Sequence, residues 1–347
     1  MRHAIAAGDT DEAMSCVEHC AMDLVKKGDL LTLLGWQRLF PIELMQSQIK
    51  VGLAIAWGLA LAMRFEDALE LLAKVERVVG NGDTGDADAI KCECEAIRSV
   101  VAALRDDSQA ALPIAEACIR KSTDPWTANV ASNVARFCHW KAGNLESFYA
   151  TQWIPFPDDE DRRNIFASVY RLCLQGLVEF QQLRLSAAER CYADAMQLAE
   201  QHAGANTAAA ALPASLIAHI RYEQGRLDEA EAMVIDRSPI IGATGMLECA
   251  LSAYLVLVRI AAHRRNIERA YALLEQLENL GHVRKCGRMV AAALAIRVRL
   301  YLTEGRITEV NGLQENIPLR HGAPGRTSHL YFGGARPFGL GPESPAG

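Results

Sequence analysis

The chain has 347 residues, half of them apolar and only 6% aromatic, and its formal net charge is −6. This negative balance, with no basic tract of five or more residues, argues against a nucleic-acid-binding surface. The apolar, uncharged stretch of residues 51–63 is too short to span a membrane, and the first residues lack the apolar core of a signal peptide. We therefore expect a cytoplasmic protein.

A short turn motif recurs along the chain. In most copies a residue able to end a helix is followed two positions later by an apolar side chain, and then by acidic residues that suit the first turn of a second helix. Small residues also recur seven positions before some turns, at Ala56, Gly176 and Ala218. The copies begin at Gly8, Met63, Arg105, Gly143, Leu183, Gly225, Arg265 and Gly305.

The spacing of these turns predicts the fold class. From Met63 onward the copies lie about forty residues apart, which is typical of stacked helical hairpins, because one hairpin cannot bury its apolar face alone. Strand patterns are nearly absent. We expect an all-α fold: a right-handed superhelical array of antiparallel helical hairpins, a tetratricopeptide-like solenoid with a repeat of about 40 residues.

Apolar spacing and capping signals locate the individual helices. We expect the segment 238–245, with Pro239, to be a loop, and Pro213 to lie in the first turn of its helix. Irregular linkers are expected at 80–85 and 154–159. The expected helices are 9–26, 29–40, 47–62, 66–79, 87–104, 108–121, 125–141, a long helix ending near 182, 186–202, 207–224, 227–236, 246–264, 267–280 and 286–304.

The pattern changes near the C-terminus. After Val310 the second helix of a last hairpin is due, but the sequence becomes rich in Gly and Pro and loses its helical period. We therefore expect residues 1–310 to form one helical repeat domain and residues 311–347 to form an irregular, disordered tail.

No motif in the sequence predicts catalysis. Residues 80–85 match Gly-x-Gly-x-x-Gly, but a helical pattern precedes them where a dinucleotide fingerprint needs a strand. Cys16, His19 and Cys20 would share a helical face, yet we favour packing or incidental exposure over a metal site, because no second pair has zinc-like spacing. We expect no enzyme, no catalytic residue, no cofactor and no bound metal.

The remaining candidate is a surface on the concave face, which the first helices of stacked hairpins line. The residues six and three positions before each turn should lie on this concave face. They include aromatic side chains beside hydrogen-bond donors, and such a pair could hold a small polar ligand or a peptide. The alternative, which we favour, is that the aromatic side chains pack between repeats and the arginines are solvated. The candidate binding residues are Trp140, His219, Tyr222, Arg259 and Arg299.

One block near the N-terminus carries a family resemblance. It comprises Leu30–Trp36, then Leu39-Phe40-Pro41, then Val51–Trp57 and Arg64–Ala68. This block resembles the MalT-type, ATP-dependent transcriptional activators of the LuxR superfamily, although Phe40 stands where Leu is usual. The hairpins that follow are similar to the superhelical sensor region of that family, and the resemblance covers roughly residues 1–310.

The resemblance implies a function. Such proteins join a signalling ATPase, a helical array and a helix-turn-helix, and only the array is found among these residues. It implies a ligand-sensing and self-association scaffold of a transcriptional regulator, which takes a small-molecule inducer, or a protein or peptide, in the concave groove and does not itself bind nucleic acid or a membrane. The alternative is a free-standing tetratricopeptide-type scaffold for protein–protein interaction.

Overall fold

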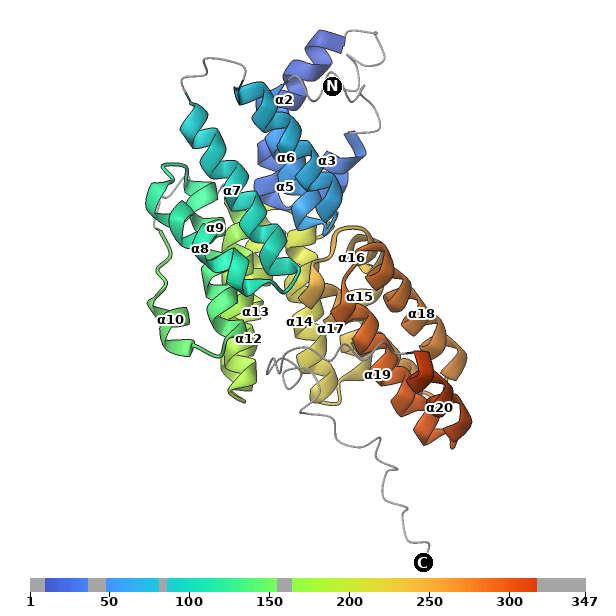
Figure 1. The fold of residues 1–347 in the computed structure, drawn as a ribbon. Coiled ribbons are helices and arrows are strands. Elements are labelled where there is room, and N and C mark those ends of the chain that lie inside the picture. The colour runs from blue at the N-terminus through green and yellow to red at the C-terminus, as the bar shows by residue number, and fades with distance from the viewer. Residues whose placement is uncertain (1–9, 37–47, 81–85, 155–163, 317–347) are drawn as a thin grey trace, which may run out of the picture.

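The fold is an array of helical hairpins, seen in a computed structural model that describes residues 10–36, 48–80, 86–154 and 164–316 (Figure 1). Those residues form seventeen helices and no strand, so the predicted all-α, tetratricopeptide-like array is confirmed. None of the described helices combines the length and the apolar character that crossing a membrane requires.

Most successive helices alternate along the chain between an inner and an outer position. The helices are α2 (Thr10–Lys27), α3 (Leu30–Trp36), α5 (Ile49–Leu61), α6 (Phe65–Gly80), α7 (Ala87–Leu104), α8 (Ser108–Lys121), α9 (Pro125–Lys141), α10 (Leu145–Ala150), α12 (Ile165–Gln181), α13 (Leu185–His202), α14 (Ala208–Glu223), α15 (Leu227–Ile235), α16 (Ser238–Thr244), α17 (Leu247–His263), α18 (Ile267–Val283), α19 (Gly287–Thr303) and α20 (Ile307–Asn316).

Most predicted helices agree with these bounds to within a few residues, and three expectations were wrong. The segment 238–245 is not a loop: α16 occupies it, and Pro239 fits because the first turn of a helix needs no backbone donor there. Pro213 lies beyond the first turn, because α14 begins at Ala208 behind the cap of Thr207. The array also continues past residue 310, since α20 runs to Asn316.

Parts of some predictions fall on residues that the structure does not describe. These are the first turn motif at Gly8, the end of the predicted helix 29–40, the linker 81–85, most of the linker 154–159, and the tail from residue 317 onward. The predicted tail therefore remains a prediction there.

The turn motif ends each first helix with a left-handed residue. Gly225 has a φ of 78°, its N–H donates to Tyr222 O at 2.9 Å, and Arg226 N–H donates to Arg221 O at 2.9 Å. This pair of hydrogen bonds is the Schellman arrangement, which satisfies the last carbonyls of a helix. Leu183 takes the same conformation with a φ of 60°, although its side chain disfavours it.

Inner and outer helices differ in how much of their surface is buried. The inner helices α5, α9, α14 and α17 are buried along almost their whole length. The outer helices bury one stripe; in α18 it consists of Ala270, Leu274, Leu277 and Gly281. The inner helices therefore form the core of the array, and the outer helices cover it.

The array turns back on itself. Ala208 N–H donates to Gly28 O at 2.9 Å, which joins the start of α14 to the turn after α2. At the other end, Arg284 donates to the carbonyl oxygens of Gly242 and Gly245 and contacts Met63 Sδ at 3.8 Å. Because these contacts draw the first hairpins against the later ones, side chains fill most of the inner face. The open concave groove expected from the sequence is therefore largely closed.

Candidate ligand site

A row of side chains follows the C-terminal ends of the inner helices. Trp140 on α9 donates its Nε1 hydrogen to Gln181 Oε1 at 2.7 Å, and the Phe180 ring on α12 lies 5.2 Å from the His219 ring on α14. Trp140 and His219 also line one small cavity, together with Leu177, Phe180, Gln181, Tyr192 and Leu216. The structure therefore brings together two of the predicted binding residues that lie 79 positions apart.

A charged group continues the row from α14 to α17. Glu223 Oε1 lies 3.5 Å from His219 Nε2 and 3.5 Å from Arg259 Nη1, and the Arg259 guanidinium lies 5.6 Å from the centre of the Tyr222 ring. The contact with His219 and the charge of Arg259 lower the pKa of Glu223, against the opposing effect of its burial. Burial raises the pKa of Tyr222. Below, "the inner row" means Trp140, Gln181, Phe180, His219, Tyr222, Glu223 and Arg259.

Each contact in the inner row joins one repeat to the next. The pairs Trp140–Gln181, Phe180–His219 and Glu223–Arg259 are separated by 41, 39 and 36 residues. Equivalent positions of neighbouring hairpins meet in this way in a solenoid. A ligand bound at the row would therefore act on the packing between repeats.

The fifth predicted residue, Arg299, lies apart from this group. It is half-buried on α19, in the following repeat, and α19 packs along α18 while it only touches α17. The predicted neighbours Arg259 and Arg299 thus lie on helices that make little contact with one another.

The structure shows how these residues are packed and paired. Trp140, Phe180 and Tyr222 do pack between repeats, as the alternative interpretation held. Arg259, however, is not solvated: it is 7% exposed and paired with Glu223. A buried arginine with a carboxylate partner beside an aromatic face offers fixed polar groups for recognition.

Sequence reasoning missed two polar members of the inner row. Gln181 is the last residue of α12, and Glu223 is the last residue of α14, directly before the turn. The prediction from the sequence considered only the residues six and three positions before each turn. The signal for Glu223 was its place four residues after His219, which puts both side chains on one helical face.

The cysteines provide little chemistry. Burial raises the pKa of the Cys249 thiol to about 12 and raises that of Cys173 well above its ordinary value, so neither is a ready nucleophile at neutral pH. Over the described ranges, no group of three or more His, Cys, Asp and Glu side chains could hold a metal ion.

A second surface lies between the outer helices α13 and α15, with α14 as its floor. Its empty space amounts to about 900 Å³, solvent-open part included. Below it is called "the outer groove", and it is lined by Ala193, Met196, Gln197, Glu200, Gln201, Ile217, Arg221, Glu229 and Met233.

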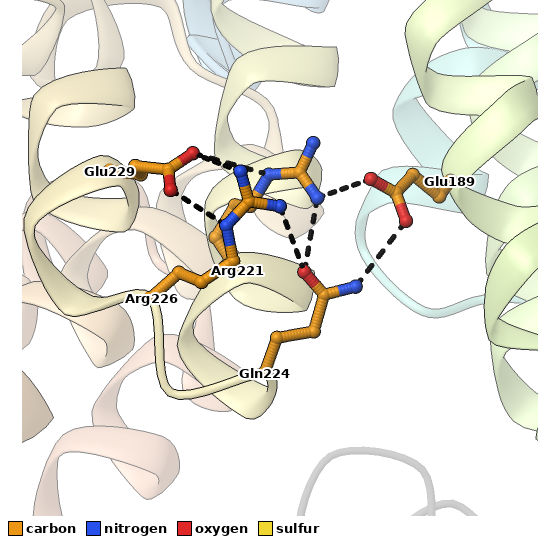
Figure 2. A network of polar contacts seen from close by, with 5 residues as sticks. All are labelled: Glu189, Arg221, Gln224, Arg226 and Glu229. Atoms are coloured by element: carbon orange, nitrogen blue, oxygen red, sulfur yellow. Dashed lines mark hydrogen bonds and ion pairs between the residues drawn. The ribbon is translucent and has the colours of Figure 1, made fainter.

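Polar contacts hold both ends of the outer groove. Figure 2 shows one end, where Arg221 on α14 points to Glu189 on α13 and where Gln224 Nε2 donates to Glu189 Oε2 at 3.3 Å. In the same network Arg226 Nε donates to Glu229 Oε1 at 2.7 Å. Near the other end, Arg237 Nη2 lies 3.3 Å from Glu200 Oε1. These ion pairs fix the distance between α13 and its neighbours.

Comparisons with known proteins agree with the repeat architecture. Residues 158–321 match the family model of the MalT-like TPR region. This segment of the chain contains the outer groove and the inner-row residues from α12 onward. The resemblance seen in the sequence is therefore confirmed for this region.

Curated relatives extend the similarity over more of the chain. The chain is 28% identical over 277 residues to the serine/threonine-protein kinase PknK of Mycobacterium tuberculosis (strain ATCC 25618 / H37Rv) and to that of Mycobacterium bovis (strain ATCC BAA-935 / AF2122/97). The alignment covers 77% of this chain and 24% of each relative, so the chain spans about a quarter of their length. No solved structure matches the chain significantly.

Proposed function

We propose that this helical array is the ligand-sensing and self-association region of a MalT-like regulator, and that it has no catalytic activity of its own. The observation that carries the proposal is the match of residues 158–321 to the MalT-like TPR region, because those residues hold most of the inner row. The similarity to a much longer kinase supports a regulatory setting, since the matched segment is a quarter of that protein.

The inner row suits a small polar metabolite. Phe180 and Tyr222 offer aromatic faces, and Glu223 Oε1 contacts both His219 and Arg259. A ligand with hydroxyl or acidic groups would compete with Glu223 for these two donors. Because Arg259 belongs to α17 and His219 to α14, such a ligand would change the contact between two repeats.

Binding measurements on the full chain test this proposal. A thermal-shift panel of sugars and other small metabolites should contain a compound that raises the melting temperature, because a ligand that binds only the folded array stabilises it. Titration calorimetry of that compound should show about tenfold weaker binding to Arg259→Gln and to His219→Ala, which corresponds to the loss of one good hydrogen bond. Arg264→Gln, on the outer surface of the same hairpin, is the matched control.

Sedimentation with and without that compound tests the self-association. We expect ligand to change the oligomeric state at fixed protein concentration. Ligand binding that is the same in the wild type and in both inner-row variants, or a panel without any binder, would contradict the proposed site.

The outer groove favours a second candidate function, a scaffold for protein–protein interaction. Met196, Met233 and Ile217 give the groove an adaptable apolar lining beside its charged residues, which suits the apolar face of a partner helix. Titration of a panel of amphipathic helical peptides tests this candidate. Met233→Glu should abolish peptide binding while His219→Ala leaves it intact, and the opposite pattern would assign the peptide to the inner row.

A further inference from the structure

A cavity lies inside the array, apart from both surfaces described above. Its empty space amounts to about 460 Å³, solvent-open part included, and α5, α7, α9, α12 and the start of α17 surround it. Its lining contains none of the residues of the inner row or of the outer groove. It is lined by Leu61, Val100, Ala103, Leu104, Trp126, Val130, Asn133, Val134, Phe137, Phe166, Ala167, Tyr170 and Met246.

Two residues of the lining each carry a buried polar atom without a partner. Among the residues that the structure describes, Trp126 Nε1 has no hydrogen-bond acceptor and Asn133 Oδ1 has no donor. Both side chains are almost fully buried, with exposed fractions of 1% and 3%. Buried polar atoms are nearly always paired, so two orphans on residues that line one cavity call for a partner.

Neighbouring contacts hold both side chains in position. Asn133 Nδ2 donates to Ala167 O at 2.8 Å, which fixes the amide plane and leaves Oδ1 as the free end. The Trp126 ring packs edge-on against Trp57, with 5.6 Å between ring centres, and Trp57 Nε1 in turn donates to Glu93 Oε1 at 2.8 Å. The orphaned donor and the orphaned acceptor are therefore held in place before any ligand binds.

The spacing of the two residues determines the shape of a ligand that would satisfy both. Trp126 and Asn133 are seven residues apart on α9, so two helical turns, about 10 Å of helix axis, separate them on one face. Val130 and Val134 lie on the same face, and the rest of the lining is almost entirely apolar. A single water could satisfy one orphan but would not reach both.

We propose that this cavity is a binding site for a small elongated apolar molecule with a hydrogen-bonding group at each end. The ligand accepts from Trp126 Nε1 at one end and donates to Asn133 Oδ1 at the other, and its apolar middle packs on Val130 and Val134. The site differs in place and in ligand chemistry from the inner row. The proposal does not depend on the proposed regulatory function, because occupancy is measured without any regulatory readout.

Two probes of similar shape test the chemistry. 4-Hydroxybenzyl alcohol carries a hydroxyl group at each end of an aromatic ring, whereas 4-ethyltoluene replaces both by apolar groups. Titrated into the full chain, the diol should bind and should move the indole N–H resonance of Trp126, which is assigned by its loss in Trp126→Phe. 4-Ethyltoluene should bind at least tenfold more weakly and leave the chemical shift of that resonance unchanged.

Three variants separate the site from its alternatives. Trp126→Phe and Asn133→Leu should each weaken binding of the diol about tenfold, the loss expected for one hydrogen bond. Ala103→Leu should fill the cavity and abolish binding. A circular-dichroism melt of this variant checks that it is folded. His219→Ala should bind the diol as the wild type does.

The opposite results would overturn the proposal. Equal binding of the two probes, or binding of the diol that is unaffected by Trp126→Phe and Asn133→Leu, would show that the orphans play no part. Failure of the diol to bind the wild type would show that the cavity holds water only. None of these results would bear on the proposed regulatory function, which the binding measurements at the inner row test separately.

Discussion

Lys285 Nζ lies 3.0 Å from Glu66 Oε1, although 219 residues separate the two in the chain. The contact joins the turn between α18 and α19 to the first turn of α6, and Figure 1 shows how the later hairpins come round to the earlier ones. Asp106 is part of the same closure, since it forms an ion pair with Arg288 and lies 3.6 Å from Lys141 Nζ. An array whose ends meet in this way unfolds with more cooperativity than an open row of repeats, in which each hairpin touches only its neighbours.

Arg284 holds the turn after α18 against the preceding repeat, which gives the first prediction. Arg284 is 6% exposed and donates to two backbone carbonyl oxygens next to α16, at Gly242 and Gly245. Arg284→Met removes these charge-assisted hydrogen bonds and leaves two acceptors buried, which should lower the free energy of unfolding by about 3 kcal/mol. Urea denaturation followed by circular dichroism measures the loss.

Arg264→Met is the matched control for Arg284→Met. Arg264 also contacts two partners, Asp228 and Glu231, but on the outer surface, where solvent screening makes ion pairs contribute little to stability. Equal losses in the two variants would show that the buried hydrogen bonds of Arg284 are no stronger than a surface ion pair.

The left-handed turns give a pair of opposite predictions. Leu183 has a φ of 60° and is 84% exposed, so its side chain adds strain and little packing. Leu183→Gly should raise the free energy of unfolding by about 0.5–1 kcal/mol, whereas Gly225→Ala, at a φ of 78°, should lower it by about 1 kcal/mol. Thermal melts of the two variants, run beside the wild type, should shift in opposite directions. A shift of the same sign in both variants would contradict this interpretation of the turns.

Gly176 gives a prediction about close packing between α12 and α13. A Cβ atom at this position would lie 2.2 Å from Cε1 of Tyr192, which is itself almost fully buried. Gly176→Ala should therefore lower the free energy of unfolding by about 1–3 kcal/mol, despite the better helix propensity of Ala. Gly287→Ala is the control, because nothing lies within 4 Å of a Cβ there, and it should be neutral or slightly stabilising. Stabilisation of both variants would show that Tyr192 moves aside at no cost.

The sequence predicted the local features of the fold well, because their causes are local. A left-handed residue ends a helix whatever surrounds it, and so Gly143, Gly225 and Gly305 marked three turns directly. The turn at Lys285, which also has a positive φ, was missed because neither Gly nor the acidic pattern accompanies it. The turn predicted to begin at Arg105 has its left-handed residue one position later, at Asp106.

The closure and the filled interior have no such local signal. Nothing near Lys285 or Glu66 in the sequence indicates that they meet, since the contact depends on how far each hairpin rotates against the previous one. Counting back from the turns did place Trp140 and His219 on the same face, and both line one cavity. The same count could not show that Arg259 is buried against Glu223, because burial depends on the neighbouring helices.

The last prediction concerns pH and rests on Glu93, a half-buried carboxyl group on α7. Burial raises the pKa of Glu93 from 4.5 to about 7; the nearby charge of Asp124 adds to the rise, while the hydrogen bond from Trp57 and the charge of Lys26 oppose it. Between these two pKa values the folded chain binds a proton that the unfolded chain has released. Stability contributed by Glu93 is therefore present at pH 4.5 and is lost as the pH rises to about 7.

The substitution Glu93→Gln tests this linkage, because glutamine can still accept the hydrogen bond from Trp57 Nε1 but cannot ionise. The free energy of urea unfolding, measured at pH 5 and at pH 8, should fall by about 2 kcal/mol more in the wild type than in Glu93→Gln over that interval. Glu116→Gln, exposed on α8, should keep the pH dependence of the wild type. If the wild type and Glu93→Gln lost the same stability between pH 5 and pH 8, the Glu93 carboxylate would have to be ionised in the folded chain throughout, with enough water around it to cancel the effect of burial.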